Sequence, residues 1–219
     1  MRYRGSHRLG KWLEQGGEKL LDARKDDLQV WYAAQRKSFC LEIGCGKGGF
    51  LQTMAKLHPD TTFVGVDKML AVVAKAAAGA ARQGLSNTTF IVGDIGHIGE
   101  LWHEPRVARI YLNFSDPWPR RRYYDRRLTH AKKLALYAKW LCADGWLEQK
   151  TDNLDLFNWS LASLAENGWD IAECARAFAE GEPDGTSLSS KYVQTEYEAK
   201  FRSMGLPIYY LRARPKQAE

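Results

Sequence analysis

The chain has 219 residues, of which 45% are hydrophobic and 26% are charged. These proportions are typical of a soluble globular protein, and no apolar run approaches the roughly 18 residues that a membrane-spanning helix needs. The N-terminal stretch lacks the apolar segment of a secretory signal, so we expect a cytoplasmic protein that does not contact a membrane.

The formal net charge is +6, and its distribution favours a polyanionic partner. Between Arg120 and Lys133 the sequence has seven basic residues and a single acidic one, Asp125. This short segment carries as much net charge as the whole chain. We therefore interpret it as a binding patch and not as a general aid to solubility.

Neither the cysteines nor the histidines indicate a metal site. Cys40, Cys45, Cys142 and Cys174 include no CxxC pair, and the five histidines show no ligand spacing. We expect reduced thiols and no bound metal.

The N-terminal part is expected to form an arm, residues 1–37, that packs on a domain of residues 38–219. In the arm, Trp12, Leu13, Leu20 and Leu21 have helical spacing, which predicts a helix.

From residue 38 on, strand and helix signals alternate, which indicates parallel βαβ units. Strands are predicted at residues 39–43, 61–67, 88–94, 107–114, 145–151, 169–178 and 207–213. Helices are predicted at about 47–57, 69–82, 126–141, 154–167 and 192–204, with a short helical piece ending near 103 and a loop over 180–190. This order predicts an α/β fold with a doubly wound, mostly parallel seven-stranded sheet, and ligands at the carboxyl ends of the strands.

The first predicted strand runs into a glycine loop, LEIGCGKGGF. Strand, glycine loop and helix in this order form a cradle for a charged or ribose-bearing ligand. Gly44, Gly46 and Gly49 fit the G-x-G-x-x-G pattern of dinucleotide-binding proteins. Glu42, Gly44, Gly46 and Gly48 fit the E-x-G-x-G-x-G pattern of S-adenosylmethionine methyltransferases. No G-K-[ST] closes the run, which excludes a Walker loop.

Acidic residues at the strand ends favour the second of these patterns. Asp67 closes the next strand, where a carboxylate accepts hydrogen bonds from ribose hydroxyls in both classes. Asp94 closes the third strand, where a carboxylate suits an adenine amino group. Glu42 suits a ligand with ammonium and sulfonium groups and suits a pyrophosphate poorly. These charges favour S-adenosylmethionine.

The fourth predicted strand delivers the stretch NFSDPWP to the same edge of the sheet. Pro117 and Pro119 fix φ and remove two backbone donors, so they hold Asp116 in a stiff turn. An Asp-Pro turn beside a buried Trp118 is the simple structural explanation, but it leaves the arginines that follow unexplained. We interpret this turn as the active-site loop.

These motifs together resemble the tRNA (guanine-N7-)-methyltransferase family of class I S-adenosylmethionine-dependent enzymes. The resemblance runs from about residue 39 to the end and rests on LEIGCGKGGF, LNFSDPWPRRRYYDRRLT, KTDN at 150–153 and TEYEAKF at 195–201. The sequence departs from the family where Asp67 replaces the usual glutamate and Arg120 the commoner lysine.

The resemblance implies roles for particular residues. The S-adenosylmethionine site would comprise Glu42, Gly44, Gly46, Asp67, Asp94 and Asp116, with Asp116 also catalytic. Substrate contacts would come from Arg120, Asp152, Thr195, Glu196, Tyr197 and Glu198. RNA contacts would come from Arg121, Arg122, Tyr123, Tyr124, Arg126 and Arg127.

The resemblance also implies the reaction, which is methylation of guanine N7 in the variable region of tRNA, at tRNA position 46. Guanine N7 has an available lone pair, so we expect Asp116 to orient the base more than to remove a proton. Two alternatives remain open: methylation of an exocyclic base amine, and a tRNA-binding subunit without turnover. Either a monomer or a homodimer is compatible with the sequence.

Overall fold

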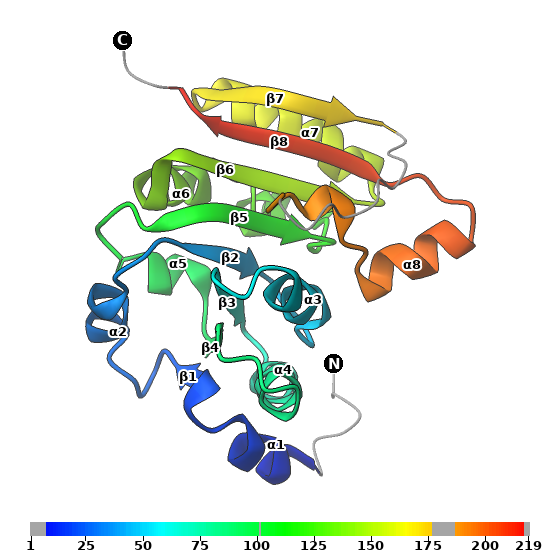
Figure 1. Cartoon of the computed structure of the whole chain (residues 1–219). Coiled ribbons are helices and arrows are strands. Elements are labelled where there is room, and N and C mark those ends of the chain that lie inside the picture. Colours follow the sequence, from blue (N-terminus) through cyan, green and yellow to red (C-terminus); the bar gives the residue numbers. More distant parts are fainter. Residues whose placement is uncertain (1–7, 101, 177–186, 217–219) are drawn as a thin grey trace. The chain divides into compact units, whose positions relative to one another are not determined.

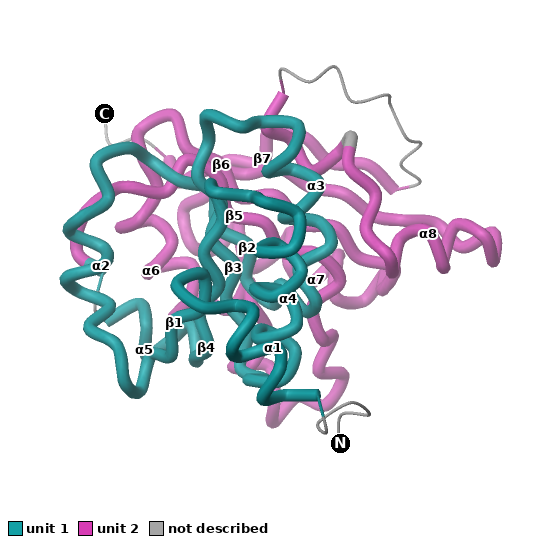
Figure 2. The backbone as a smooth tube through the Cα atoms, turned by 60° about the horizontal axis from the view of Figure 1, so that its bottom comes forward, with its two compact units in different colours: residues 1–102 teal, residues 103–219 magenta. Residues whose placement is uncertain are grey.

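A computed structural model describes residues 8–100, 102–176 and 187–216 (Figure 1). The chain divides into two compact units, residues 1–102 and residues 103–219, which we call unit 1 and unit 2 (Figure 2). The predicted boundary between arm and domain, after residue 37, falls inside unit 1 and stays a prediction. The predicted loop over 180–190 lies mostly outside the described residues.

Unit 1 contains a four-stranded, fully parallel set of strands in the order β1-β4-β3-β2. Its elements are α1 (Leu9–Gly16), η2 (Gly17–Lys19), β1 (Leu20–Asp22), α2 (Leu28–Ala34), β2 (Phe39–Ile43), α3 (Gly49–Leu57), β3 (Thr62–Asp67), α4 (Leu70–Arg82), β4 (Thr88–Val92) and α5 (Ile95–Gly99).

The core of unit 1 explains why its strands read as nearly continuous apolar runs. Strands β2, β3 and β4 are buried along most of their length, as expected where helices cover a parallel sheet. Close packing reaches the backbone at Gly65 of β3, because a Cβ added there would lie 2.7 Å from Leu51 Cδ1. Helix α4 buries a row of alanines, whose small side chains also allow close approach.

The prediction of a helix through Trp12, Leu13, Leu20 and Leu21 is wrong in its second half. Helix α1 ends at Gly16, and Gly17 follows with φ 45°. Leu20 and Leu21 instead form β1, an eighth strand, which pairs with β4. Trp12 does lie in α1, where it packs on α4 against Ala74 and Ala78, and Figure 1 shows the two helices side by side.

Unit 2 contains strands in the order β5-β6-β8-β7, of which β5 and β6 are parallel and the other pairs antiparallel. Its elements are β5 (Val107–Asn113), η3 (Arg121–Arg126), α6 (Ala131–Trp140), β6 (Leu141–Thr151), α7 (Leu154–Glu166), β7 (Trp169–Ala175), η4 (Ser190–Tyr192), α8 (Glu196–Ser203) and β8 (Tyr209–Pro215). The mostly parallel α/β fold is confirmed, with all seven predicted strands present and β1 added.

Capping side chains account for two helix boundaries that the sequence interpretation placed too early. The helix predicted from residue 126 begins at Ala131, because His130 caps it by accepting from Lys132 N. The helix predicted from residue 192 begins at Glu196, because the Thr195 side chain accepts from Glu198 N. No helix in the described part of the chain is long and apolar enough to cross a membrane.

The glycine loop between β2 and α3 needs backbone conformations that other residues rarely adopt. Gly44, Gly46 and Gly48 have φ values of 82°, 54° and 75°. A Cβ added at Gly44 would meet nothing within 4 Å, whereas one at Gly48 would lie 2.8 Å from both Ala76 Cβ and Phe90 Cε1. The loop is therefore open at its start and packed against the core at its end.

This contrast predicts different costs for two matched substitutions. Both Gly44→Ala and Gly48→Ala introduce a left-handed alanine, but only Gly48→Ala also overpacks the core. We expect Gly48→Ala to lower the free energy of unfolding by about 1–3 kcal/mol more than Gly44→Ala does. Urea unfolding followed by circular dichroism measures both. Equal losses would mean that the loop shifts to accommodate the added methyl group.

Candidate functional site

The predicted donor site begins with a contact between the glycine loop and the end of β3. Gly46 N donates to Asp67 Oδ2 at 3.2 Å, and Met69 N donates to Asp67 Oδ1 at 3.0 Å. The Asp67 carboxylate therefore fixes the loop relative to the start of α4. The space beside Gly44 and Gly46 is open, so a ligand can approach the backbone there.

Two further carboxylates lie at the same edge of unit 1. Glu42 in β2 is 3% exposed and lies two residues before Gly44, the first glycine of the loop. Asp94 follows β4, where its Oδ1 accepts from Gly96 N at 2.7 Å and its Oδ2 pairs with Lys68 Nζ at 2.5 Å. The parallel strands thus bring Glu42, Asp67 and Asp94 together at their carboxyl ends, as the sequence predicted.

The electrostatics of this edge are negative. Burial raises the pKa of the Cys45 thiol well above its usual range, and the charges of Glu42 and Asp67 act in the same direction. Cys45 therefore stays protonated at neutral pH. The smaller part of this shift, which comes from Glu42 and Asp67, reflects their negative charge, and that charge favours a cationic ligand over an anionic one.

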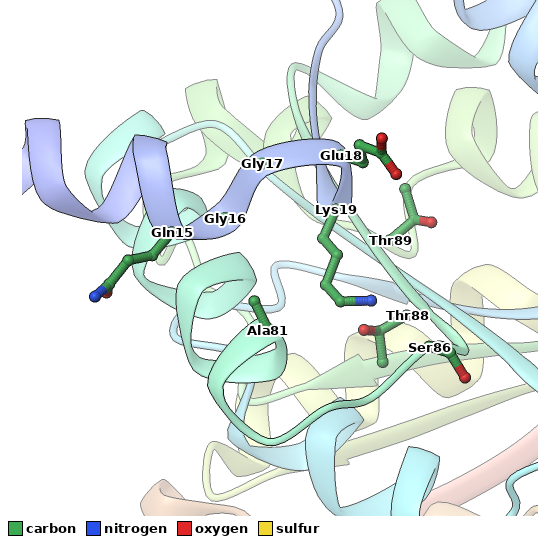
Figure 3. Close-up of a pocket in the computed structure, with 9 residues that line it drawn as sticks. All are labelled: Gln15, Gly16, Gly17, Glu18, Lys19, Ala81, Ser86, Thr88 and Thr89. Carbon is green, nitrogen blue, oxygen red and sulfur yellow. The ribbon is translucent and has the colours of Figure 1, made fainter.

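Unit 1 also has a hollow of about 450 Å³ away from the carboxyl ends of its strands. It is bounded by residues 15–19 and by Ala81, Ser86, Thr88 and Thr89, and Figure 3 shows the Lys19 side chain extending toward Thr88. Thr88 begins β4, whereas Asp94 follows its other end. This hollow is therefore distinct from the predicted donor site.

In unit 2, the turn that carries Asp116 is held in an unfavourable backbone conformation. Phe114 has φ 51° and Trp118 has φ 42°, and these are the only non-glycine residues with positive φ in the described ranges. Each such residue costs about 1–3 kcal/mol, and such strain clusters at functional sites. Asp116 is exposed between them.

Arg127 stabilises this turn from the inside. Its Nε donates to Pro117 O at 2.9 Å and its Nη2 to Trp118 O at 3.2 Å. Its Cζ lies 3.8 Å from the ring centroid of Tyr124 and 4.7 Å from that of Trp159. The side chain is buried, and this burial lowers its pKa. The guanidinium is thus engaged within unit 2, and the contact with RNA predicted for Arg127 stays a prediction.

The other predicted RNA-binding arginines are at the surface. Arg122 and Arg126 place Cζ 4.8 Å and 4.6 Å from the Tyr123 ring centroid, and Arg126 also lies 4.9 Å from that of Trp118. Tyr123 and Trp118 are in edge contact at 5.9 Å. These aromatic rings order the cations. The exposed arginines of the segment are Arg120, Arg121, Arg122 and Arg126.

A buried lysine that the sequence interpretation missed organises the segment before α8. Lys150, in β6, is fully buried and its Nζ donates to Ser190 O, Val193 O and Glu198 Oε2 at 2.6–2.9 Å. Lys150 lies one residue before the end of β6 at Thr151, a position that gives no local signal of burial. A lysine inside a strand is usually at the surface, and only the fold reveals its burial.

The predicted substrate residues around α8 divide into two groups. Glu198 is buried between Lys150 and Arg202, and Thr195 caps the helix, so both side chains are engaged inside unit 2. Glu196 and Tyr197 are exposed, and Tyr197 stacks on Phe114, which begins the Asp116 turn. The structure thus brings Tyr197 near that turn.

Asp152 completes the predicted set. It follows β6 and is half-buried, and the next residue, Asn153, caps α7 by accepting from Leu156 N at 2.8 Å.

Within residues 8–100, 102–176 and 187–216, no three His, Cys, Asp or Glu side chains are arranged to hold a metal ion.

Two solved structures that share this fold are methyltransferases. The antibiotic-resistance methyltransferase Kmr has a TM-score of 0.58 at 17% identity, covering 88% of this chain and 93% of its own. A variant of the 16S rRNA (adenine(1408)-N(1))-methyltransferase from Catenulisporales acidiphilia, with its cosubstrate SAM, has a TM-score of 0.57 at 14% identity, covering 96% and 92%. At these identities the likeness concerns the fold alone.

Sequence comparison is more specific. The family model described as "Putative methyltransferase" matches residues 36–211. The tRNA (guanine-N(7)-)-methyltransferase of Macrococcus caseolyticus is 35% identical, covering 88% of each chain. The enzyme of that name from Geobacillus thermodenitrificans is 40% identical, covering 81% of this chain and 80% of its own. The chain therefore belongs to the tRNA (guanine-N(7)-)-methyltransferase family.

Proposed function

We propose that this protein transfers a methyl group from S-adenosylmethionine to N7 of a guanine in the variable region of tRNA, at position 46, forming 7-methylguanine. Family membership supports the reaction class and the tRNA substrate. In this chain the proposal depends most on Asp116, which is exposed between two residues with positive φ. A structural turn has no need of such strain, whereas a preorganised carboxylate does.

The donor is proposed to bind at the carboxyl edge of unit 1. Glu42, Asp67 and Asp94 supply carboxylates, and Gly44 and Gly46 supply backbone with open space beside it. These groups fit a ligand with a ribose, an adenine amino group and positive charge. When bound, S-adenosylmethionine supplies an electrophilic methyl group on a sulfonium. Asp116 was also predicted to touch the donor, and this remains a proposal.

The chemistry leaves the protein mainly the task of alignment. Guanine N7 carries a lone pair and needs no prior deprotonation, so holding it at near-attack distance contributes most, up to roughly 7–11 kcal/mol in well-oriented reactions. We propose that Asp116 and Asp152 accept from the N1–H and N2 amino edge. Their negative charge stabilises the positive charge that guanine acquires, and Arg120 contacts the same nucleotide.

The position of N7 restricts which guanine is accessible. N7 faces the major groove, which in A-form RNA is too deep and narrow for side chains to enter. The target must therefore be unpaired or turned outward, as a guanine in the variable region can be. The exposed arginines Arg121, Arg122 and Arg126 are proposed to hold phosphates around it.

One experiment separates the proposed reaction from two alternatives, an amino-methyltransferase and a tRNA-binding subunit without turnover. The protein is incubated with labelled S-adenosylmethionine and unmodified tRNA, and the tRNA is digested to nucleosides. We expect label only in 7-methylguanosine. Label in N6-methyladenosine would identify an amino-methyltransferase, and tight tRNA binding without label would identify a non-catalytic subunit. Light scattering on the same sample distinguishes a monomer from a homodimer.

Replacing Asp116 with the isosteric asparagine tests the orienting carboxylate. We expect Asp116→Asn to lower kcat by about 10²- to 10³-fold, as removal of a preorganised electrostatic group does, with tRNA affinity changed less than about twofold. The matched control is Asp125→Asn, an exposed carboxylate in the same segment, which should leave kcat unchanged. Parallel loss of binding and turnover would give Asp116 a structural role.

The arginines are expected to differ according to their burial. Replacing exposed Arg121 and Arg122 with alanine should reduce the slope of log K against log[salt] for tRNA by up to roughly 0.7–0.9 for each phosphate that is no longer neutralised. Arg127→Ala should leave that slope unchanged and lower the free energy of unfolding by about 2–3 kcal/mol, because hydrogen bonds from a charged group are removed. A reduced slope for Arg127→Ala would restore its predicted role in binding RNA.

A further inference from the structure

A hollow of about 280 Å³ in unit 2 has no role in the reaction described above. It lies between the prolines of the Asp116 turn, Pro117 and Pro119, and the first turns of α7. Neither Asp116 nor Asp152 lines it. The hollow therefore adjoins the residues proposed to hold the target guanine without including them, since Pro117 and Asn153, which line it, are the chain neighbours of Asp116 and Asp152.

Rings form the apolar walls of this hollow. Tyr124 and Trp159 line it and lie in edge contact, with centroids 5.8 Å apart. The Arg127 guanidinium lies over both rings, and its hydrogen bonds to the turn fix the wall opposite the prolines. Tyr124 and Trp159 are half-buried, and the buried Arg127 side chain holds this wall against the turn.

The remaining lining groups are polar and balanced in charge. Arg127 is the one cation and Asp155 the one anion among the lining residues, and the two interact electrostatically. Asn158 accepts from Arg176 Nη2 at 2.9 Å through its Oδ1, which leaves its NH2 group as a donor. The site therefore offers a carboxylate acceptor and an amide donor beside flat rings.

This combination suits a nucleobase and disfavours a phosphate. A phosphate would meet the Asp155 carboxylate, and Arg127 already uses its Nε–H and one Nη2–H on carbonyl oxygens. A base has a flat face for the rings and both donors and acceptors on its edges. The volume is just below the roughly 300–1,000 Å³ of pockets for drug-sized ligands, which suits one base.

We propose that this hollow, lined by Pro117, Pro119, Tyr124, Asn158 and Trp159, binds the unpaired base of a nucleotide adjacent to the target guanine. The inference rests on the proposed function, since an RNA substrate must bring that base. The target guanine has to be unpaired or turned outward, and a neighbouring base that leaves the stack with it comes within reach of the hollow. Capture of a neighbour fixes the register of the RNA on the enzyme.

The test combines a change in the protein with a change in the RNA. Three tRNAs are compared: one intact, one abasic at the nucleotide 5′ of the target guanine, and one abasic at the nucleotide 3′ of it. Each is titrated against the full-length protein and the variants Trp159→Ala and Asn158→Ala. Trp146→Ala is the matched control, because Trp146 is also half-buried beside arginine side chains, Arg212 and Arg214, and does not line the hollow.

With the unchanged protein, we expect one of the two abasic tRNAs to bind about 5- to 150-fold more weakly, the loss typical of one base–aromatic stack. Trp159→Ala should weaken binding of intact tRNA similarly and show no further loss with that abasic tRNA. Asn158→Ala, at an exposed position, should show part of this coupling, and Trp146→Ala none. Circular dichroism confirms that each variant is folded.

The inference would be overturned if the loss of tRNA affinity caused by Trp159→Ala or Asn158→Ala simply added to the loss caused by each abasic site. If Trp159→Ala does not fold, the inference is tested by Asn158→Ala and by the affinity of the unchanged protein for the two abasic tRNAs. The proposed function is judged separately on intact tRNA. If 7-methylguanosine forms but neither abasic site weakens binding, only the neighbouring-base site is wrong. If no 7-methylguanosine forms, the proposed function itself fails.

Discussion

The contact on which the candidate substrate region most depends is that of the Arg127 guanidinium with the backbone of the Asp116 turn. Two residues of that turn have positive φ, and an exposed loop would relax from such a conformation unless something held it. Arg127 holds it through the carbonyls of Pro117 and Trp118, and Tyr124 and Trp159 hold Arg127. The strain of the turn is thus offset by a buried cation. The Asp116 carboxylate, which is proposed to orient the guanine, therefore needs little reorganisation when substrate binds.

Unit 2 contains two buried cations that donate hydrogen bonds to backbone carbonyls. Lys150 donates to two carbonyls and to Glu198, and so fixes the segment that leads into α8, as Arg127 fixes the turn after β5. The exposed cations, Arg120, Arg121, Arg122 and Arg126, are available to RNA instead. Positive charge in this protein therefore has two physical roles, which burial separates. Buried cations donate to backbone carbonyls that need partners, and the exposed cations are those proposed to attract phosphates in a salt-dependent way.

The sequence predicted most of the fold and part of the site, and the failures have physical reasons. All seven predicted strands are present because each is an apolar run bounded by turn residues, whereas β1 is only three residues inside a polar arm. The positions of Gly44, Gly46, Asp67 and Asp94 at the carboxyl edge of unit 1 were predictable, because they follow directly from the order of the strand ends. The burial of Arg127, Thr195 and Glu198 was not predictable, because a motif does not show whether a polar side chain faces solvent or a partner within the protein. Lys150 and Trp159 were missed because their burial and stacking depend on segments far away in the sequence.

The central claim is that the nucleophile is N7 of a guanine in the variable region of tRNA. It is tested most directly by replacing that single guanine with 7-deazaguanine, which puts C–H in place of N7 and keeps the N1–H and N2 amino edge. The account predicts that this tRNA binds with nearly the affinity of the unmodified tRNA, because the edge proposed for Asp116 and Asp152 and the phosphates proposed for the arginines are unchanged. It also predicts that methyl incorporation falls to background. Methylation of the 7-deazaguanine tRNA at the normal rate would contradict the account.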